Sequence, residues 1–194
     1  MEIIRLISYL LTFIFLTMLF LIYFDRGSKT KYTVPMSSSK SDRQITGPAY
    51  GTIIDISNTE DDEIRIAIFL SVFNIHKQYY PYHGKVKSHT CEVGEHHLAF
   101  DESKSKYNQQ CKTIMQTEYG NITVIQASGY LVREINFDNN VGNDVLRGQF
   151  LGNILFGSRV DLIIPKNKVE LYVQKDDHIN GPNTIIGRFK DHLL

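Results

Sequence analysis

The chain has 194 residues, which leaves about 150 for one folded domain once an apolar N-terminal segment is set aside. Lys plus Arg and Asp plus Glu each total 21, so the charge balance gives no basis for a nucleic-acid partner. Two cysteines, Cys91 and Cys111, are too few for a disulfide framework, and the sequence leaves open whether they pair or stay reduced.

The N-terminal segment is predicted to be a membrane anchor. Residues 6–24 carry no charge, and a helix of this length nearly matches a hydrocarbon core of about 30 Å. A cleaved signal peptide would have a shorter apolar region and a following small-x-small site, which Tyr23-Phe24-Asp25-Arg26 does not offer. A buried core helix is disfavoured because no face of the segment is polar. We therefore expect residues 1–24 to form a retained, single-pass anchor.

The residues after the span predict its orientation and a linker. Arg26, Lys29 and Lys31 follow the span, whereas only Arg5 precedes it, so the positive-inside rule favours the cytosolic side for the soluble domain. Residues 25–46 are polar, contain Gly, Pro and a run of Ser, and show no apolar period. They are expected to form a flexible linker to a soluble domain at residues 47–194.

Short apolar runs separated by turn residues predict that the soluble domain is mainly antiparallel β. Strands are expected at residues 52–56, 64–72, 112–117, 122–126, 159–165 and 169–174. Tyr119-Gly120 is a plausible hairpin turn between the third and fourth of these strands. Long helical periodicity is missing, and residues 96–110 are expected to hold one short helix or an ordered loop.

A weak internal repeat refines the expected architecture. Residues 142–148 and 175–181 both read x-[Asn/Asp]-Asp-x-[Leu/Ile]-x-Gly, and each precedes an apolar strand. Such polar turns closed by glycine resemble those of lipoyl-like barrel-sandwich folds. We therefore expect an antiparallel barrel-sandwich (lipoyl-like) domain behind an N-terminal transmembrane helix.

The segment Phe156-Gly157-Ser158-Arg159-Val160-Asp161 resembles the processing motif of short phosphatidylserine decarboxylases. In that family a Gly-Ser bond rearranges and the serine becomes an N-terminal pyruvoyl group. Further matches follow the family order at residues 66–76 (IAIFLSVFNIH), 117–120, 124–129 with Arg133, and 141–152. The similarity covers residues 47–190, nearly the whole soluble domain.

The resemblance implies a pyruvoyl-dependent carboxy-lyase that converts phosphatidylserine, a membrane phospholipid, to phosphatidylethanolamine and CO₂. Ser158 would attack the carbonyl carbon of Gly157, which carries no side chain to obstruct the approach. The pyruvoyl group derived from Ser158 would serve as an electron sink while CO₂ leaves. His76 aligns with the histidine that supplies a proton in the family. Family members often dimerise, so a homodimer is also implied.

Three departures from the family pattern leave the base for self-cleavage open. Tyr50 stands where the family usually has the aspartate of Pro-Ala-Asp-Gly, and Tyr79 stands where longer members place a second histidine. Asn108-Gln109-Gln110 replaces Asn-Glu-Arg. A serine hydroxyl needs help to react, so His83, His76 or backbone strain would have to provide it.

These departures motivate two alternative functions. The chain could be an unprocessed, catalytically inactive homologue anchored in the membrane, with a binding or structural role. It could also be a pyruvoyl decarboxylase of another amine-bearing acid, which the membrane anchor disfavours.

Two further groups of side chains have competing interpretations. The spacing of His89, Cys91, His96, His97 and Cys111 matches no closed structural zinc site because the cysteines are isolated, so no metal site is predicted. The aromatic residues around His76 predict either core packing or an aromatic lip facing the membrane; they are Phe73, Tyr79, Tyr80 and Tyr82.

Overall fold

The computed structural model describes residues 2–27, 42–71, 73–95, 97, 102–105, 107–129, 135–138, 140–154 and 158–191. The chain divides into two compact units, Met1–Tyr32 and Thr33–Leu194.

The first unit contains one helix, α1 (Glu2–Gly27), which includes the predicted anchor and continues three residues beyond it. Its apolar stretch Glu2–Phe20 has a mean hydropathy of 2.2, and none of it is buried in the protein. The hydroxyls of Thr12 and Thr17 donate to the carbonyls of Ser8 and Phe13 at 2.8 and 2.7 Å. These bonds satisfy polar side chains inside the helix, as a lipid environment demands. By length and composition, α1 is a candidate membrane span.

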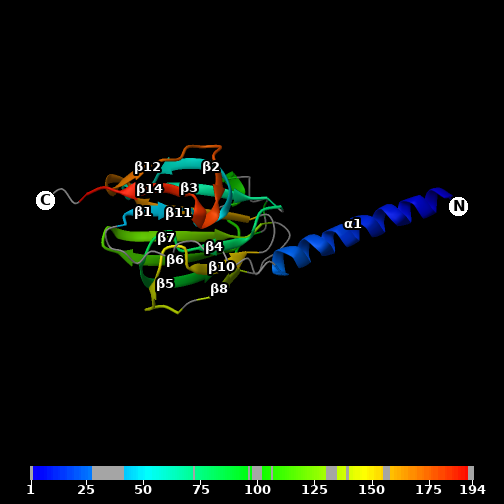
Figure 1. The fold of residues 1–194 in the computed structure, drawn as a ribbon, viewed down its shortest axis with the longest axis horizontal. Coiled ribbons are helices and arrows are strands. Elements are labelled where there is room, and N and C mark those ends of the chain that lie inside the picture. The colour runs from blue at the N-terminus through cyan, green and yellow to red at the C-terminus, as the bar shows by residue number, and fades with distance from the viewer. Residues whose placement is uncertain are drawn as a thin grey trace. The chain divides into compact units, whose positions relative to one another are not determined.

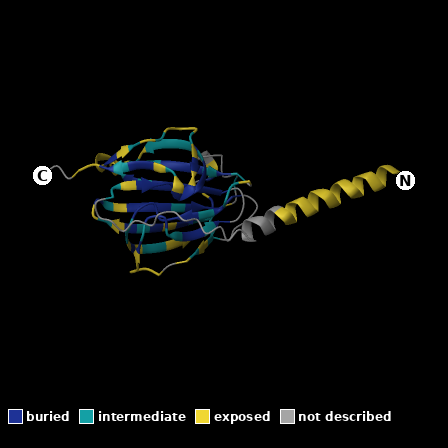
Figure 2. Cartoon of the chain, in the orientation of Figure 1, coloured by how far each residue is buried: buried dark blue, intermediate teal, exposed yellow. Residues whose placement is uncertain are grey.

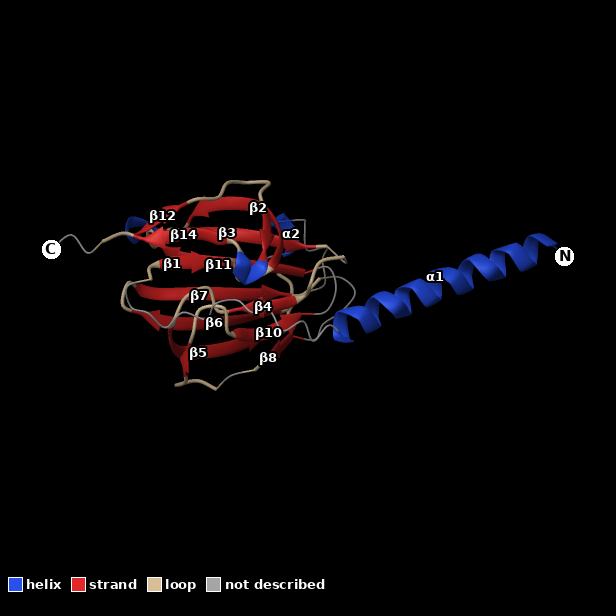
Figure 3. Ribbon diagram, viewed as in Figure 1, coloured by secondary structure: helices blue, strands red, loops and turns tan. Residues whose placement is uncertain are grey.

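The second unit is built almost entirely of antiparallel strands, as predicted (Figures 1 and 3). The main sheet has the order β13-β2-β3-β11-β7-β6-β5-β9. Its strands are β2 (Tyr50–Asn58), β3 (Glu63–Leu70), β5 (Gly84–Glu92), β6 (Gln110–Thr117), β7 (Gly120–Ala127), β9 (Asp144–Val145), β11 (Ser158–Pro165) and β13 (His178–Asn180). β11 lies inside this sheet, paired with β3 over eight positions and with β7 over five.

Two smaller sheets complete the second unit, with the orders β1-β14-β12 and β4-β10-β8. Their strands are β1 (Gln44–Thr46), β14 (Ile185–Phe189), β12 (Val169–Leu171), β4 (Lys77–Tyr79), β10 (Phe150–Ile154) and β8 (Ile135–Phe137). The short helices are α2 (Glu102–Ser105), η1 (Lys166–Lys168) and η2 (Gly181–Asn183).

The observed strands differ from the predicted ones at several places. All six predicted strand regions carry a strand, although β3 and β12 end earlier than expected. β1 falls within residues 25–46, so the folded unit begins inside the stretch predicted to be linker. α2 is the short helix that was one of the two expectations for residues 96–110. β5 was not predicted at all.

Both predicted glycine turns have the expected backbone. Gly148 and Gly181 adopt positive φ angles of 78° and 54°, a region that L side chains rarely enter. A Cβ at Gly181 would lie 2.4 Å from the Tyr50 ring, so glycine is also required there for packing. The two turns therefore close as the sequence repeat indicated.

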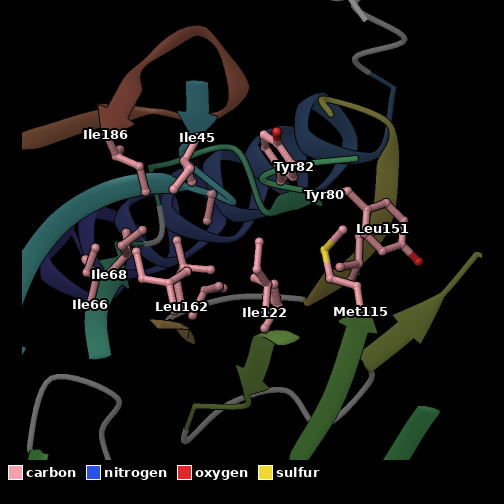
Figure 4. Packing of buried hydrophobic residues seen from close by; sticks show 14 of the residues in the cluster. Ile45, Ile66, Ile68, Tyr80, Tyr82, Met115, Ile122, Leu151, Leu162 and Ile186 are labelled. Carbon is pink, nitrogen blue, oxygen red and sulfur yellow. The ribbon is translucent and has the colours of Figure 1, made fainter. Parts of the chain in front are cut away.

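The core combines alternate residues on the inner face of the main sheet with residues of β1, β10, β12 and β14 from the two smaller sheets (Figures 2 and 4). Ile66 and Ile68 from β3 meet Leu162 from β11 and Ile122 from β7, all fully buried. Each such side chain contributes about 1.5–3 kcal/mol when removed from water.

The aromatic residues around His76 belong mostly to this core. Tyr79, Tyr80 and Tyr82 are 5%, 0% and 0% exposed, whereas Phe73 is 79% exposed. The Tyr82 ring packs edge-on against Phe189 with centroids 4.9 Å apart. The aromatic-lip hypothesis is therefore wrong for the three tyrosines, because their rings fill the space between the sheets.

Candidate active site

Ser158 is the first residue of β11, and it occupies a core position. Its backbone pairs with Leu70 of β3. Side chains alternate along a strand, so Ser158 shares the inner face with Val160 and Leu162. Ser158 is fully buried, and its Oγ has no hydrogen-bond partner among the described atoms. A hydroxyl left in this state costs about 1–3 kcal/mol, so a serine here has no stabilising structural role.

The other half of the predicted cleavage site, Gly157, lies outside the described residues. Phe156 and Arg133, which belong to the same family resemblance, also lie outside them. The chain enters the site through β10, whose last residue is Ile154.

His76 is 2% exposed and is fixed by its backbone neighbours. Its Nδ1 lies 2.7 Å from the carbonyl oxygen of Asn74. Because a carbonyl can only accept, Nδ1 carries the hydrogen, and in the neutral ring Nε2 keeps the lone pair. The backbone N–H of Ile154 donates to the His76 carbonyl at 3.2 Å. His76 is thereby attached to the strand that leads directly toward Ser158.

A pair of buried glutamines connects His76 to the main sheet. Gln126 of β7 donates from Nε2 to Oε1 of Gln78 at 3.0 Å, and Gln78 donates to the His76 carbonyl at 3.1 Å. Both glutamines are fully buried, and Gln126 lies opposite Val160 of β11. The sequence analysis missed them. The sequence signal for them is an amide side chain at a strand position where an apolar residue is expected. A buried amide at such a position needs a hydrogen-bond partner.

The charged residues of the motif lie on the opposite face of β11. Arg159 and Asp161 are 2% and 3% exposed, and Arg159 Nε lies 2.9 Å from Asp161 Oδ1. Arg65 of β3 donates to Asp161 Oδ2, also at 2.9 Å. Arg159 further donates to the Ser105 hydroxyl of α2. These contacts hold β3, β11 and α2 together behind Ser158, so Arg159 positions the strand.

A second buried serine, Ser128, follows β7. Arg159 pairs with Ala127, so the continued register places Ser128 opposite Ser158. Ser128 is fully buried, and its Oγ also has no partner among the described atoms. Asn108 donates from Nδ2 to the carbonyls of Ser128 and His97 at 2.7 and 2.8 Å. The first residue of Asn108-Gln109-Gln110 thus fixes the backbone beside the candidate site.

The two tyrosines that depart from the family pattern touch each other. Tyr50 and Tyr79 pack edge to face with ring centroids 6.2 Å apart. Tyr79 makes a similar contact with Phe150 of β10. An aromatic pair therefore fills the positions where aspartate and, in longer members, histidine are expected.

His83, the possible auxiliary base, lies near the opposite end of the main sheet. Its ring stacks on Tyr82 at 4.0 Å, and its Nε2 lies 3.8 Å from Glu118. A pocket of about 500 Å³ is lined there by residues that include His83, Lys85, Glu118 and Asp144. The length of β7, roughly 20 Å or more, separates that end from Ser158. The structure therefore does not bring His83 to Ser158.

The two cysteines form a disulfide between β5 and β6, which resolves the pairing that the sequence left open. Cys91 and Cys111 lie directly opposite each other in the register. Burial lowers the pKa of the neighbouring His89 below its usual value. His96 lies outside the described residues, and His97 contacts Glu95 Oε2 at 2.5 Å.

Comparison with known proteins gives one family. The model of the phosphatidylserine decarboxylase family matches residues 33–187. A phosphatidylserine decarboxylase proenzyme of Carboxydothermus hydrogenoformans is 31% identical over 183 residues, covering 91% of this chain and 83% of that protein. The proenzyme of the same name from Rickettsia felis is 34% identical over 159 residues, covering 77% of this chain and 68% of that protein.

A further relative comes from an archaeon. A protein of Methanosarcina barkeri, whose name proposes archaetidylserine as its substrate, is 32% identical over 171 residues, covering 88% of this chain and 78% of that protein. The family match includes β11, which begins with Ser158, and His76, which directly precedes β4. The chain therefore belongs to the phosphatidylserine decarboxylase family, a family of carboxy-lyases.

Proposed function

We propose that this chain is a proenzyme that cleaves itself between Gly157 and Ser158 and then decarboxylates phosphatidylserine at a pyruvoyl group derived from Ser158. The observation that carries the proposal is the buried Ser158 Oγ, which has no described partner at the start of a central strand. The names of the relatives, all proenzymes of serine-lipid decarboxylases, support the same reaction.

Self-cleavage would begin with Ser158 Oγ. The oxygen attacks the Gly157 carbonyl carbon, the peptide C–N bond breaks, and an ester joins the two residues. Elimination then releases the Gly157 carboxylate and leaves dehydroalanine at position 158. Water hydrolyses this group, releasing ammonia and leaving the pyruvoyl ketone. The backbone pairing of Ser158 with Leu70 would hold the attacking oxygen on the buried inner face of β11 during these steps.

The residues around Ser158 suit this group and a serine headgroup. The ketone would supply an electron sink for the electron pair that stays on the substrate carbon when CO₂ leaves. Ser128 Oγ and Gln126 Oε1 are buried and lack described partners, so Gln126 Oε1 can accept a hydrogen bond from the ammonium group of the substrate and Ser128 Oγ can donate one to its carboxylate. His76, whose Nδ1–H donates to the Asn74 carbonyl, can give a proton from Nε2 to the substrate carbon when the ring is in its protonated form.

The test of self-cleavage is the intact mass of the purified protein under denaturing conditions. Wild type should give two fragments, and the shorter one should be lighter by one ammonia than plain hydrolysis would make it. Ser158→Ala should stay whole. Ser128→Ala is the matched control, because this serine is equally buried and equally unpartnered, and its variant should still split. Cleavage that survives Ser158→Ala would refute the assignment.

Turnover is tested separately on the cleaved protein. Release of labelled CO₂ from carboxyl-labelled phosphatidylserine in vesicles should fall by about 10²–10⁴-fold in His76→Gln if His76 supplies the proton. The same variant should still cleave if strain at the Gly157–Ser158 bond, and not His76, drives processing. Unchanged turnover would remove His76 from the mechanism.

A second candidate function is an unprocessed, inactive homologue with a binding or structural role. The Tyr50–Tyr79 contact favours it, because these rings cannot supply the carboxylate and imidazole expected at their positions. Wild-type protein that remains whole after long incubation with and without membranes would support this candidate and exclude the proenzyme.

We also propose that α1 anchors the chain with its second unit on the cytosolic side, and that the protein forms a homodimer. The orientation rests on Arg26, Lys29 and Lys31 after the apolar segment. Protease digestion of sealed vesicles tests it, since a lumenal domain would be protected. The homodimer rests on the family resemblance, and sedimentation of the detergent-solubilised chain tests it.

A further inference from the structure

Three side chains with metal-binding atoms meet on one face of the hairpin formed by β5 and β6. His89 and Cys91 are alternate residues of β5, and Cys111 lies directly opposite Cys91. The His89 nitrogen and the two sulfur atoms all lie within 4.8 Å of one another. His89 Nε2 is 3.4 Å from Cys91 Sγ. The sequence spacing hid this cluster, because the two cysteines are 20 residues apart.

We propose that His89, Cys91 and Cys111 form a metal site that the Cys91–Cys111 disulfide blocks, and that the reduced site binds Zn²⁺. Two thiolates and one imidazole match the ligand preference of this ion. With Zn–S and Zn–N bonds of about 2.3 and 2.0 Å, a tetrahedral site places nitrogen and sulfur about 3.5 Å apart. The 3.4 Å separation of His89 Nε2 and Cys91 Sγ therefore already suits a shared ion.

The histidine is held in the orientation that a ligand needs. His89 Nδ1 lies 2.9 Å from the Thr113 hydroxyl, which is across the strand pair. The ring also stacks on Phe137 of β8, with centroids 3.8 Å apart and planes 6° from parallel. When the Thr113 hydroxyl accepts from Nδ1–H, the Nε2 lone pair points toward the sulfur atoms. Contacts of this kind around a ligating histidine raise metal affinity by about 10–100-fold.

The site is accessible to an ion and keeps one position open. Cys91 is exposed and His89 is half-buried, whereas Cys111 is 1% exposed and forms the floor. Three protein ligands leave the fourth tetrahedral position to water or to a small exogenous ligand. The two thiolates also balance the charge of Zn²⁺.

Disulfide and metal exclude each other because both use the same sulfur atoms. A dithiol reductant supplies two electrons and two protons to the Cys91–Cys111 bond and becomes a disulfide itself. Zn²⁺ then displaces both thiol protons as it binds. After loss of the ion, a small disulfide oxidant takes up two electrons and two protons from the two thiols, becomes a dithiol, and restores the Cys91–Cys111 bond.

The test is a metal titration of the full chain in detergent, on a Ser158→Ala background so that one uncut species is present. Co²⁺ serves as the probe because thiolate ligands give it a near-ultraviolet charge-transfer absorption. After reduction by a phosphine, we expect one Co²⁺ per chain with this absorption, and Zn²⁺ should displace it. The oxidised protein has the same sequence and fold, and it should show no such absorption.

Two variants and one matched control identify the ligands. His89→Ala should abolish the tight absorbing complex, and Thr113→Val should weaken Co²⁺ binding about 10–100-fold. His178→Ala is the control, because His178 Nδ1 makes the same 2.9 Å bond to a threonine, Thr52, at a position without cysteines. His178→Ala should leave the titration unchanged.

Three results would overturn the proposal. They are no charge-transfer absorption in the reduced protein, equal binding before and after reduction, and unchanged affinity in His89→Ala. The titration does not depend on self-cleavage or decarboxylation, so its outcome tests the metal site independently of the proposed function.

Discussion

The two arginines that flank Asp161 predict a large loss of stability when its charge is removed. Asp161 and Arg159 are 3% and 2% exposed, and each carboxylate oxygen of Asp161 lies 2.9 Å from an arginine Nε, one of Arg159 and one of Arg65. Asp161→Asn keeps the shape of the side chain but leaves the buried guanidinium of Arg159 without its counter-charge.

Removing one partner of a buried ion pair costs about 3–5 kcal/mol, at least about a fifth of the stability of a typical domain, which is about 5–15 kcal/mol. The matched control is Asp55→Asn. Asp55 contacts the same Arg65 at 3.4 Å, but its side chain is 28% exposed. Solvent screening reduces such a pair to about 0–1 kcal/mol.

Urea unfolding of the Ser158→Ala protein, followed by the tyrosine signal, measures both variants. Asp161→Asn should lower the midpoint strongly with an unchanged m value, and Asp55→Asn should barely move it. If the two variants lose the same free energy of unfolding, or if Asp161→Asn loses less than about 1 kcal/mol, the ion pairs of Asp161 with Arg159 and Arg65 are screened by solvent. That result would refute the prediction that they act as buried ion pairs.

Three further predictions concern the Cys91–Cys111 disulfide, Tyr82 and Gln126. Reducing the Cys91–Cys111 disulfide, which closes a loop with a sequence separation of 20, should lower the free energy of unfolding by about 3 kcal/mol in the same urea assay. Burial, then the neighbouring Tyr119 and Glu118, raises the pKa of Tyr82, so the unfolded chain loses this proton first as pH rises. Stability should therefore be complete below about pH 10 and decline above it by up to about 1.4 kcal/mol per pH unit, and Tyr82→Phe should flatten that decline in unfolding curves at several pH values. Gln126→Leu removes the donor to Gln78 Oε1 and leaves that buried oxygen unsatisfied, so it should lower the free energy of unfolding by about 1–3 kcal/mol and slow CO₂ release. If neither quantity changes, the Gln78–Gln126 bond does not support His76.

The sequence predicted those parts of the fold that depend on local apolar patterns. β3 and β11 each contain an apolar run, at residues 66–70 and 162–165, and their core positions follow from alternation. β5 escaped prediction because Val86 is its single buried residue, and the rest of the strand is polar or partly exposed at the side of the sheet. Its place in the fold comes from pairing with β6, which no local pattern encodes.

The sequence predicted Ser158 and His76 as site residues, but it did not predict the contacts that hold them in place. Ser158 and His76 were identified by resemblance to a family, and the structure places both at one end of the second unit's sheets. The contacts that fix them depend on register between distant strands, as the Gln78–Gln126 bond shows. The pairing of Cys91 with Cys111 likewise depends on the register between β5 and β6. His83 was proposed from its type alone, and the length of β7 separates it from Ser158.

The position of β11 between β3 and β7 indicates that folding would have to precede the proposed cleavage. A cut before Ser158 would make β11 the first strand of the shorter product, with β3 and β7 of the longer product on either side. The shorter product would also supply β13 to β2 and β14 to β1. The two products would share strands of the same sheets, so they could dissociate only by unfolding. If the proposed cleavage occurs, it would thus be a maturation step that a finished fold can survive, because neither product would have the strands to rebuild the sheet alone.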